Sequence, residues 1–125
     1  MLFRSKVSDE KCYAFIDGGM ADNLRPQLYQ SKYSITTGLK SGNGDSVYTI
    51  AGKFCESGDI LAENVELGTL SVDDILVVFG TGAYNYTMAS NYNRYRRPAM
   101  VLVGSGESKV LVRRETYQDI VQYDE

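Results

Sequence analysis

The sequence predicts an all-β fold, a mainly antiparallel, Greek-key-like β-barrel or sandwich with two short helices. The 125 residues include 12 glycines and only 2 prolines, a composition typical of chains with many tight turns. Between the turns lie roughly six short stretches that are rich in β-branched and aromatic residues and have the length of strands. A chain of this length forms one domain and buries a core without a metal or a disulfide.

The beginning of the chain is expected to hold a tail, a strand and a helix. Residues 1–10 are polar and aperiodic, which predicts a loose tail. Residues 11–17 (KCYAFID) partly alternate and end at two glycines, as a strand that enters a turn does. The first short helix is expected over residues 23–30, because Pro26 stands near its start and Asn23 can cap it.

The rest of the chain is expected to consist of strands joined by glycine-containing turns. The expected strands cover residues 33–37, 47–54, 74–79, 99–103 and 109–113. Residues 55–59 are expected to form a turn, which the apolar residues 60–62 follow. The run at 74–79 (DILVVF) does not alternate, which predicts a strand buried on both faces. Residues 38–46 are expected to be a loop, and residues 104–106 (GSG) a hairpin turn. The second short helix is expected at 115–123, with Glu115 at its positively charged end.

The composition excludes several classes of site. The chain has no histidine, so it cannot supply a Ser-His-Asp or Cys-His nucleophilic site or an imidazole metal ligand. Its two cysteines are too few for a Cys₄ zinc site or a disulfide framework, and they are expected to be reduced thiols. The net charge of −3 argues against a nucleic-acid partner, and no apolar run approaches the roughly 18 to 20 residues of a membrane span. We therefore expect a cytoplasmic protein with no metal site.

Polar clusters at the ends of expected elements are the candidates for a functional site. Arg25 and Tyr29 share a helix face, where a guanidinium can bind a carboxylate through two hydrogen bonds. Cys55 is a thiol that can donate a proton near neutral pH, and the adjacent Glu56 can bind an ammonium group. Tyr84 follows small residues that let a ligand approach the backbone. On residue pattern alone, an ordinary structural role is favoured for the Arg25–Tyr29 pair and for the Cys55–Glu56 pair. For Tyr84, a structural role and contact with a ligand are equally favoured.

Seven short motifs follow one another along the chain. They are DGGM (17–20), RPQLY (25–29), CESGD (55–59), GAY (82–84), SNYN (90–93), RPA (97–99) and RRETY (113–117). Together they resemble the C-terminal part of the diaminopimelate decarboxylases, pyridoxal-phosphate enzymes of the last step of lysine biosynthesis. Each motif alone is weak, but CESGD with GAY and SNYN at these spacings separates that family from ornithine and arginine decarboxylases.

The resemblance implies that residues 11–125 are a C-terminal β-domain that works with an N-terminal (β/α)₈ barrel, which this sequence lacks. In that family the active site lies where the barrel of one subunit meets the β-domain of its homodimer partner. By motif, Cys55 would protonate the reacting carbon after CO₂ leaves, and Glu56 would bind the distal ammonium of meso-diaminopimelate. Arg25 and Tyr29 would hold the distal carboxylate, and Tyr84 would contact pyridoxal 5′-phosphate.

The resemblance assigns the cofactor's attachment lysine, a stacking histidine and the phosphate loop to the barrel. The lysines of this chain lie outside the family's lysine motif, and the spacing before Arg97 departs from the usual pattern. The chain alone is therefore expected to be inactive, and to supply substrate-binding groups and a proton donor to an enzyme that forms L-lysine. The alternative is a stand-alone amino-acid-binding module that kept the scaffold and lost catalysis.

Overall fold

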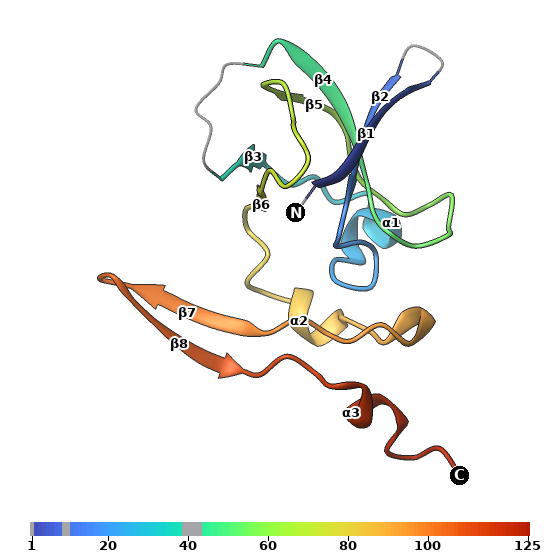
Figure 1. Ribbon diagram of the computed structural model, residues 1–125, viewed down its shortest axis with the longest axis vertical. Helices are drawn as coiled ribbons and strands as arrows, with labels where there is room; N and C mark the ends of the chain where they lie inside the picture. Colours follow the sequence, from blue (N-terminus) through green and yellow to red (C-terminus); the bar gives the residue numbers. More distant parts are fainter. Residues whose placement is uncertain (1, 9–10, 39–43) are drawn as a thin grey trace.

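The structure, a computed structural model, describes residues 2–8, 11–38 and 44–125, and its largest sheet has four strands (Figure 1). The strands are β1 (Leu2–Ser8), β2 (Lys11–Ile16), β4 (Ser46–Ala51) and β5 (Ile60–Leu67), in the order β1-β2-β4-β5. The outer pairs are antiparallel, whereas β2 and β4 run parallel. A parallel pair needs a long crossover, and here that crossover contains α1 (Arg25–Tyr29) and β3 (Ile35–Thr37).

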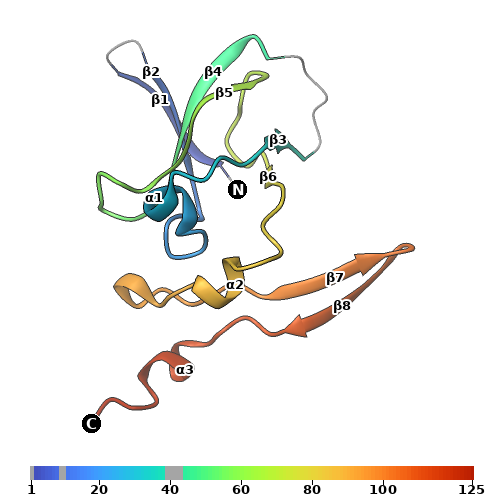
Figure 2. The same cartoon turned by 180° about the vertical axis from the view of Figure 1, so that it is seen from behind.

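The remaining elements form two small antiparallel sheets and three further short helices. β3 pairs with β6 (Leu76–Val78), and β7 (Met100–Gly104) pairs with β8 (Glu107–Val112). The helices are α2 (Asn85–Met88), the 3₁₀ helix η1 (Tyr92–Arg94) and α3 (Tyr117–Val121). Figure 2 shows α2, the β7–β8 hairpin and α3 in a second layer beside the one that contains the four-stranded sheet and α1.

The core lies on the four-stranded sheet. It contains Ala14, Ile16, Tyr48, Ile50, Leu61, Leu67 and Leu70. Ala14 and Ile50 are directly opposed in the β2–β4 pair and are both fully buried. Because alternate residues of a strand point to the same face, this register brings the apolar side chains of the two strands together. The hydroxyl of Tyr48, also in this core, accepts a hydrogen bond of 3.2 Å from the backbone N–H of Leu70.

The all-β fold class and the expected strands from residue 11 onward are confirmed, and so are both expected helices. The strand pairs among the described residues do not close into a barrel. The hairpin turn at 104–106 is also confirmed, since Ser105 and Gly106 have the positive φ angles, 51° and 79°, that suit a two-residue turn. In the expected loop at 38–46, residues 39–43 lie outside the described part of the chain.

Three expectations differ from the structure. Residues 2–8 form β1 instead of a tail, because backbone pairing with β2 supports a strand that the sequence pattern does not indicate. The run at 74–79 is not buried on both faces, since Ile75 is 51% exposed and Phe79 54% exposed. α2 was not expected, because the tyrosine, threonine and asparagine of residues 85–87 favour helices only weakly.

No helix in residues 2–8, 11–38 or 44–125 is both long enough and apolar enough to cross a membrane. The β7–β8 hairpin nevertheless exposes several aliphatic side chains, at exposed fractions of 46% to 73%. They are Val101, Leu102, Val103, Val110 and Leu111. Exposed aliphatic side chains in this number are typical of an element that contacts another protein surface.

We expect Ile50→Ala to lower the free energy of unfolding by about 3 kcal/mol, because the packed core around this side chain cannot collapse fully into the cavity left behind. Val47→Ala, on the same strand at a position that is 51% exposed, is the matched control and should cost less than about 1 kcal/mol. Urea denaturation followed by circular dichroism measures both. Equal losses would contradict the position of the core.

Candidate active site

The candidate site is built around a buried carboxylate, that of Asp59. Its side chain accepts hydrogen bonds from the backbone N–H groups of Met20, at 2.6 Å, and Phe54, at 2.8 Å. Asp59 is only 2% exposed, so these backbone donors replace the water molecules that would otherwise solvate its carboxylate. Its own backbone carbonyl accepts from Gly52 at 2.8 Å. Asp59 thereby ties the loop between β4 and β5 to the loop between β2 and α1.

Two glycines make room for this carboxylate. A Cβ atom on Gly52 would overlap the Asp59 carboxylate, and one on Gly19 would lie 2.8 Å from an oxygen of the same group. At either position a side chain would therefore collide with Asp59. The glycine of DGGM and the aspartate of CESGD are therefore parts of one packing arrangement, which joins two motifs that are far apart in the sequence.

The structure brings Arg25, Tyr29 and Tyr84 together. The guanidinium carbon of Arg25 lies 5.1 Å from the centre of the Tyr29 ring and 5.0 Å from the centre of the Tyr84 ring. Both rings are more than half exposed, so the arginine is held between two phenols at the surface. Cation–π contacts of this kind fix the plane of a guanidinium and leave its N–H groups free to meet a carboxylate.

The helix that presents Arg25 begins differently from the expectation. Its N-cap is Leu24, with no side-chain capping bond, whereas Asn23 lies buried before it and both polar atoms of its side chain lack a partner among the described residues. Pro26 lies in the first turn, as expected. Gln27 Nε2 donates to the carbonyl of Ile60 at 2.8 Å, which attaches the helix to the start of β5.

Cys55 and Glu56 lie side by side on the exposed surface of the β4–β5 loop, and the thiol of Cys55 is free. The hydroxyl of Tyr92 donates a hydrogen bond to Glu56 Oε1, and this bond to a carboxylate raises the pKa of the Tyr92 phenol above its ordinary value. The ring of Tyr92 meets the buried Phe54 ring edge-on, with centroids 5.6 Å apart. Tyr92 lies in the SNYN motif, but nothing in the sequence pattern shows that it reaches Glu56.

The expected site residues thus fall into two groups. Arg25, Tyr29 and Tyr84 form one, and Cys55 and Glu56 form the other with Tyr92. Within the described ranges, no hydrogen bond, ion pair or ring contact joins the two groups directly. The second group is attached to the loop between β2 and α1 through Asp59 and through the bond of 3.0 Å from Ser90 N, near Tyr92, to the carbonyl of Ala21. Arg25 and Tyr29 of the first group lie on α1, which follows the same loop.

A polar cluster of Asn91, Arg97 and Glu115 holds the turn at residues 91–95, which contains Tyr92 of the second group. Asn91 Nδ2 donates to Glu115 Oε2 at 2.6 Å, and Arg97 Nε donates to Glu115 Oε1, also at 2.6 Å. Burial acts to raise the pKa of Glu115, but the hydrogen bonds from Arg97 and Asn91 outweigh it and the pKa lies below its ordinary value. Glu115 therefore binds Arg97 and does not begin the last helix, which Thr116 caps together with Asp119.

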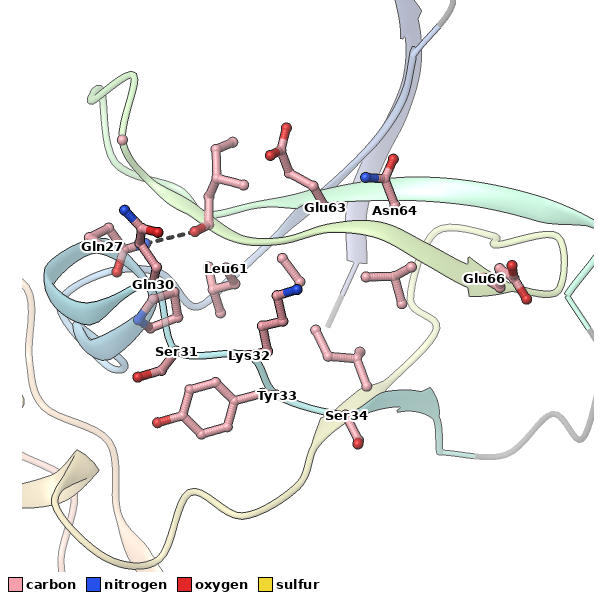
Figure 3. A pocket seen from close by; sticks show the side chains of 16 residues that line it. Gln27, Gln30, Ser31, Lys32, Tyr33, Ser34, Leu61, Glu63, Asn64 and Glu66 are labelled. Carbon is pink, nitrogen blue, oxygen red and sulfur yellow. Dashed lines mark hydrogen bonds between the residues drawn. The ribbon is translucent and has the colours of Figure 1, made fainter.

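Several hollows lie beside these groups, and one of about 360 Å³ is lined by Glu56 together with Phe54 and Asp59. An open groove of about 970 Å³ runs between β5 and residues 30–34, and none of the expected site residues lines it (Figure 3).

A further hollow of about 600 Å³ lies between the β2–α1 loop, α2 and the start of β7. The buried amides of Asn23 and Asn85 line it, and the Nδ2 atom of each lacks a hydrogen-bond partner in the described part of the chain. Burial raises the pKa of Asp22 at its edge, and Lys53 offsets this only in part.

Residues 2–82, more than half of the chain, match the sequence family of the C-terminal sheet domain of pyridoxal-dependent decarboxylases. The chain belongs to this family. It is 48% identical over 122 residues to the diaminopimelate decarboxylase of Bacillus subtilis, covering 97% of this chain and 28% of that relative. It therefore spans little more than a quarter of the length of this relative.

Solved structures are similar over almost the whole chain. A crystal structure of diaminopimelate decarboxylase from M. jannaschii covers 99% of this chain with a TM-score of 0.92 and 36% identity, and the match covers 28% of that protein. A diaminopimelate decarboxylase from Helicobacter pylori, complexed with L-lysine, covers 97% with a TM-score of 0.87 and 28% identity, over 29% of its own length. The fold of the described residues is thus that of one domain in larger enzymes.

We expect Gly52→Ala to lower the free energy of unfolding by about 3 kcal/mol, because the added methyl group forces Asp59 away from its backbone donors. Gly104→Ala is the matched control, since a Cβ at Gly104 meets no atom within 4 Å, and should change stability by less than about 0.5 kcal/mol. Thermal unfolding of the two variants measures the difference. A Gly52→Ala protein as stable as the control would contradict the packing described for Asp59.

The lowered pKa of Glu115 makes a prediction about acid stability. A carboxylate whose pKa is lower in the folded state contributes stability above its unfolded pKa, and this is lost as the pH falls through the folded pKa. We therefore expect Glu115→Gln to flatten the fall in unfolding free energy between about pH 5 and pH 3. Urea titrations at several pH values measure the slope. Glu107→Gln, on the exposed β8 strand, should leave it unchanged, and an equal effect of both variants would refute the ion-pair assignment.

Proposed function

We propose that this chain is the C-terminal β-domain of a diaminopimelate decarboxylase, which converts meso-2,6-diaminopimelate into L-lysine and CO₂. The observation that carries the proposal is the exposed Cys55–Glu56 pair, presented on a loop that the buried Asp59 fixes. In this role the domain supplies a proton donor and substrate-binding groups to a cofactor site on a barrel domain. By itself it is inactive.

The charges of the two groups match the distal end of the substrate. Diaminopimelate differs from lysine by a carboxylate beside its distal ammonium, so an enzyme that selects it needs both a cation and an anion at that end. Arg25, held between Tyr29 and Tyr84, supplies the cation for the carboxylate. Glu56 supplies the anion for the ammonium. The L-lysine in the complexed relatives has the chemistry of the proposed product.

Pyridoxal phosphate supplies the electron sink that decarboxylation requires. The residues of this chain fit a contact with it at Tyr84, which is 64% exposed and follows Gly82, around which a Cβ position is open. Cys55 can then deliver the proton of its thiol to the carbon from which CO₂ has left, and the resulting thiolate is reprotonated from solvent. Because the Cys55 thiol is exposed on this domain, it can face a substrate that is bound between this domain and a second protein surface.

The proposed partners are a pyridoxal-phosphate barrel domain and the second subunit of a homodimer. The exposed aliphatic side chains of the β7–β8 hairpin support a surface of this kind, and the chain spans only 28% of its B. subtilis relative. We propose the cytoplasm as the compartment, because both cysteines are free thiols and persist as such in a reducing environment.

The test is a chimera in which this chain replaces the matching part of the B. subtilis enzyme. We expect it to form lysine from meso-diaminopimelate, and we expect Cys55→Ala to lower kcat by about 100- to 10,000-fold because the proton donor is lost. Cys12→Ala removes the other thiol, on β2, and should leave kcat within about twofold. Coupled assay of lysine formation measures all three proteins.

Two outcomes would refute the proposed function. One is a folded chimera that binds pyridoxal phosphate and makes no lysine. The other is equal activity of the Cys55→Ala and Cys12→Ala proteins. Calorimetry on this chain alone then distinguishes the remaining candidate, since a binding module releases or absorbs heat with diaminopimelate or lysine in the absence of any barrel.

A further inference from the structure

We propose that Tyr92 is a positioning residue for Glu56: its phenol fixes the orientation in which this carboxylate meets the ammonium group of an amino-acid substrate. The proposal rests on the proposed function, because it assigns Glu56 a ligand. Its direct observation is the hydrogen bond from the Tyr92 hydroxyl to Glu56 Oε1. Glu56 is exposed, and an exposed glutamate without such a bond samples several rotamers.

The ring of Tyr92 is fixed by the same unit that fixes the loop of Glu56. It meets the ring of Phe54 edge-on at 5.6 Å, and Phe54 is only 7% exposed. The backbone N–H of Phe54 is bound by the buried Asp59 carboxylate at 2.8 Å. The acceptor carboxylate therefore lies on residues 54–59, and the ring of the donor phenol packs against Phe54 of the same segment.

The backbone turn that places Tyr92 is unusual and well anchored. Asn93 and Arg94 both have left-handed φ angles, 53° and 57°, which non-glycine residues adopt only when other contacts compensate. Arg94 forms an ion pair with Asp124, and the side chain of Asn91 donates to the carbonyl of Tyr95 at 3.0 Å. This geometry turns the chain so that the rings of both Tyr92 and Tyr95 reach Phe54.

The arrangement leaves Glu56 able to bind a cation. Tyr92 occupies Oε1, so Oε2 faces no donor in the described part of the chain, and the phenol adds no charge that would compete with an ammonium group. The nearest lysine along the chain, Lys53, lies 4.4 Å from the centre of the Tyr95 ring, where a cation–π contact holds it. The carboxylate is thus oriented by a neutral donor, and its second oxygen stays open to a ligand.

Rotamer measurements on this chain test the positioning without any enzyme activity. Side-chain coupling constants of Glu56, measured by nuclear magnetic resonance, should report one χ1 rotamer in the unaltered protein and averaged rotamers in Tyr92→Phe. Tyr95→Phe is the matched control: it is the same substitution on the neighbouring ring against Phe54, and it should leave Glu56 in one rotamer. Identical couplings in all three proteins would overturn the proposal.

Kinetics in the chimera then test the consequence for substrate binding. Tyr92→Phe should raise KM for meso-diaminopimelate about tenfold, as expected for one hydrogen bond to a charged group, with kcat within about twofold. Tyr95→Phe should change neither. An unchanged KM in an active Tyr92→Phe chimera would overturn the proposal. An inactive unaltered chimera contradicts the proposed function instead, and the rotamer comparison still decides whether Tyr92 orients Glu56.

Discussion

A carboxylate that is almost fully buried has lost its hydration, and it is tolerated only where hydrogen-bond donors replace water. Asp59 obtains these donors from the backbone of two loops that are separated by more than thirty positions, at Met20 and at Phe54. Because the donors are backbone groups, the bonds fix the path of the chain itself. The loop with Cys55 and Glu56 and the loop that leads into the helix of Arg25 therefore hold a set position relative to each other, although no hydrogen bond, ion pair or ring contact among the described residues joins the two groups.

Aromatic rings extend this arrangement from the buried carboxylate to the surface. Phe54 is bound to Asp59 through its backbone and to Tyr92 and Tyr95 through its ring. In the other group, Tyr29 and Tyr84 lie against the guanidinium of Arg25. The high tyrosine content of the chain, 10 of 125 residues, thus has a physical use: phenols pack as apolar surfaces and orient charged groups without neutralising them.

The sequence predicted the strands with clear β-rich composition and the hairpin turn at 104–106, because these depend on residue type and local spacing. The roles of Arg25, Cys55 and Glu56 follow only from the family resemblance and stay predictions. The sequence did not predict β1, whose existence depends on a free edge of β2, nor the half-exposure of β6, which depends on the number of layers around it. Tyr92 was missed for a similar reason. Its partner is 36 positions away, and a contact over that separation follows from the turn at Asn93 and Arg94, which has no signature in the sequence.

The exposure of the polar groups agrees with a site completed by another surface. An arginine, a glutamate and a thiol interact with a ligand only weakly in water, since the high dielectric constant screens their charges, and they become effective when a covering surface excludes the solvent. In such an assembly each domain must orient its own groups before the surfaces meet, because reorienting them afterwards would cost binding energy. The buried Asp59, the stacked Arg25 and the Tyr92–Glu56 hydrogen bond are contacts of this kind: each is formed within this chain and leaves a charged or proton-donating group facing outward.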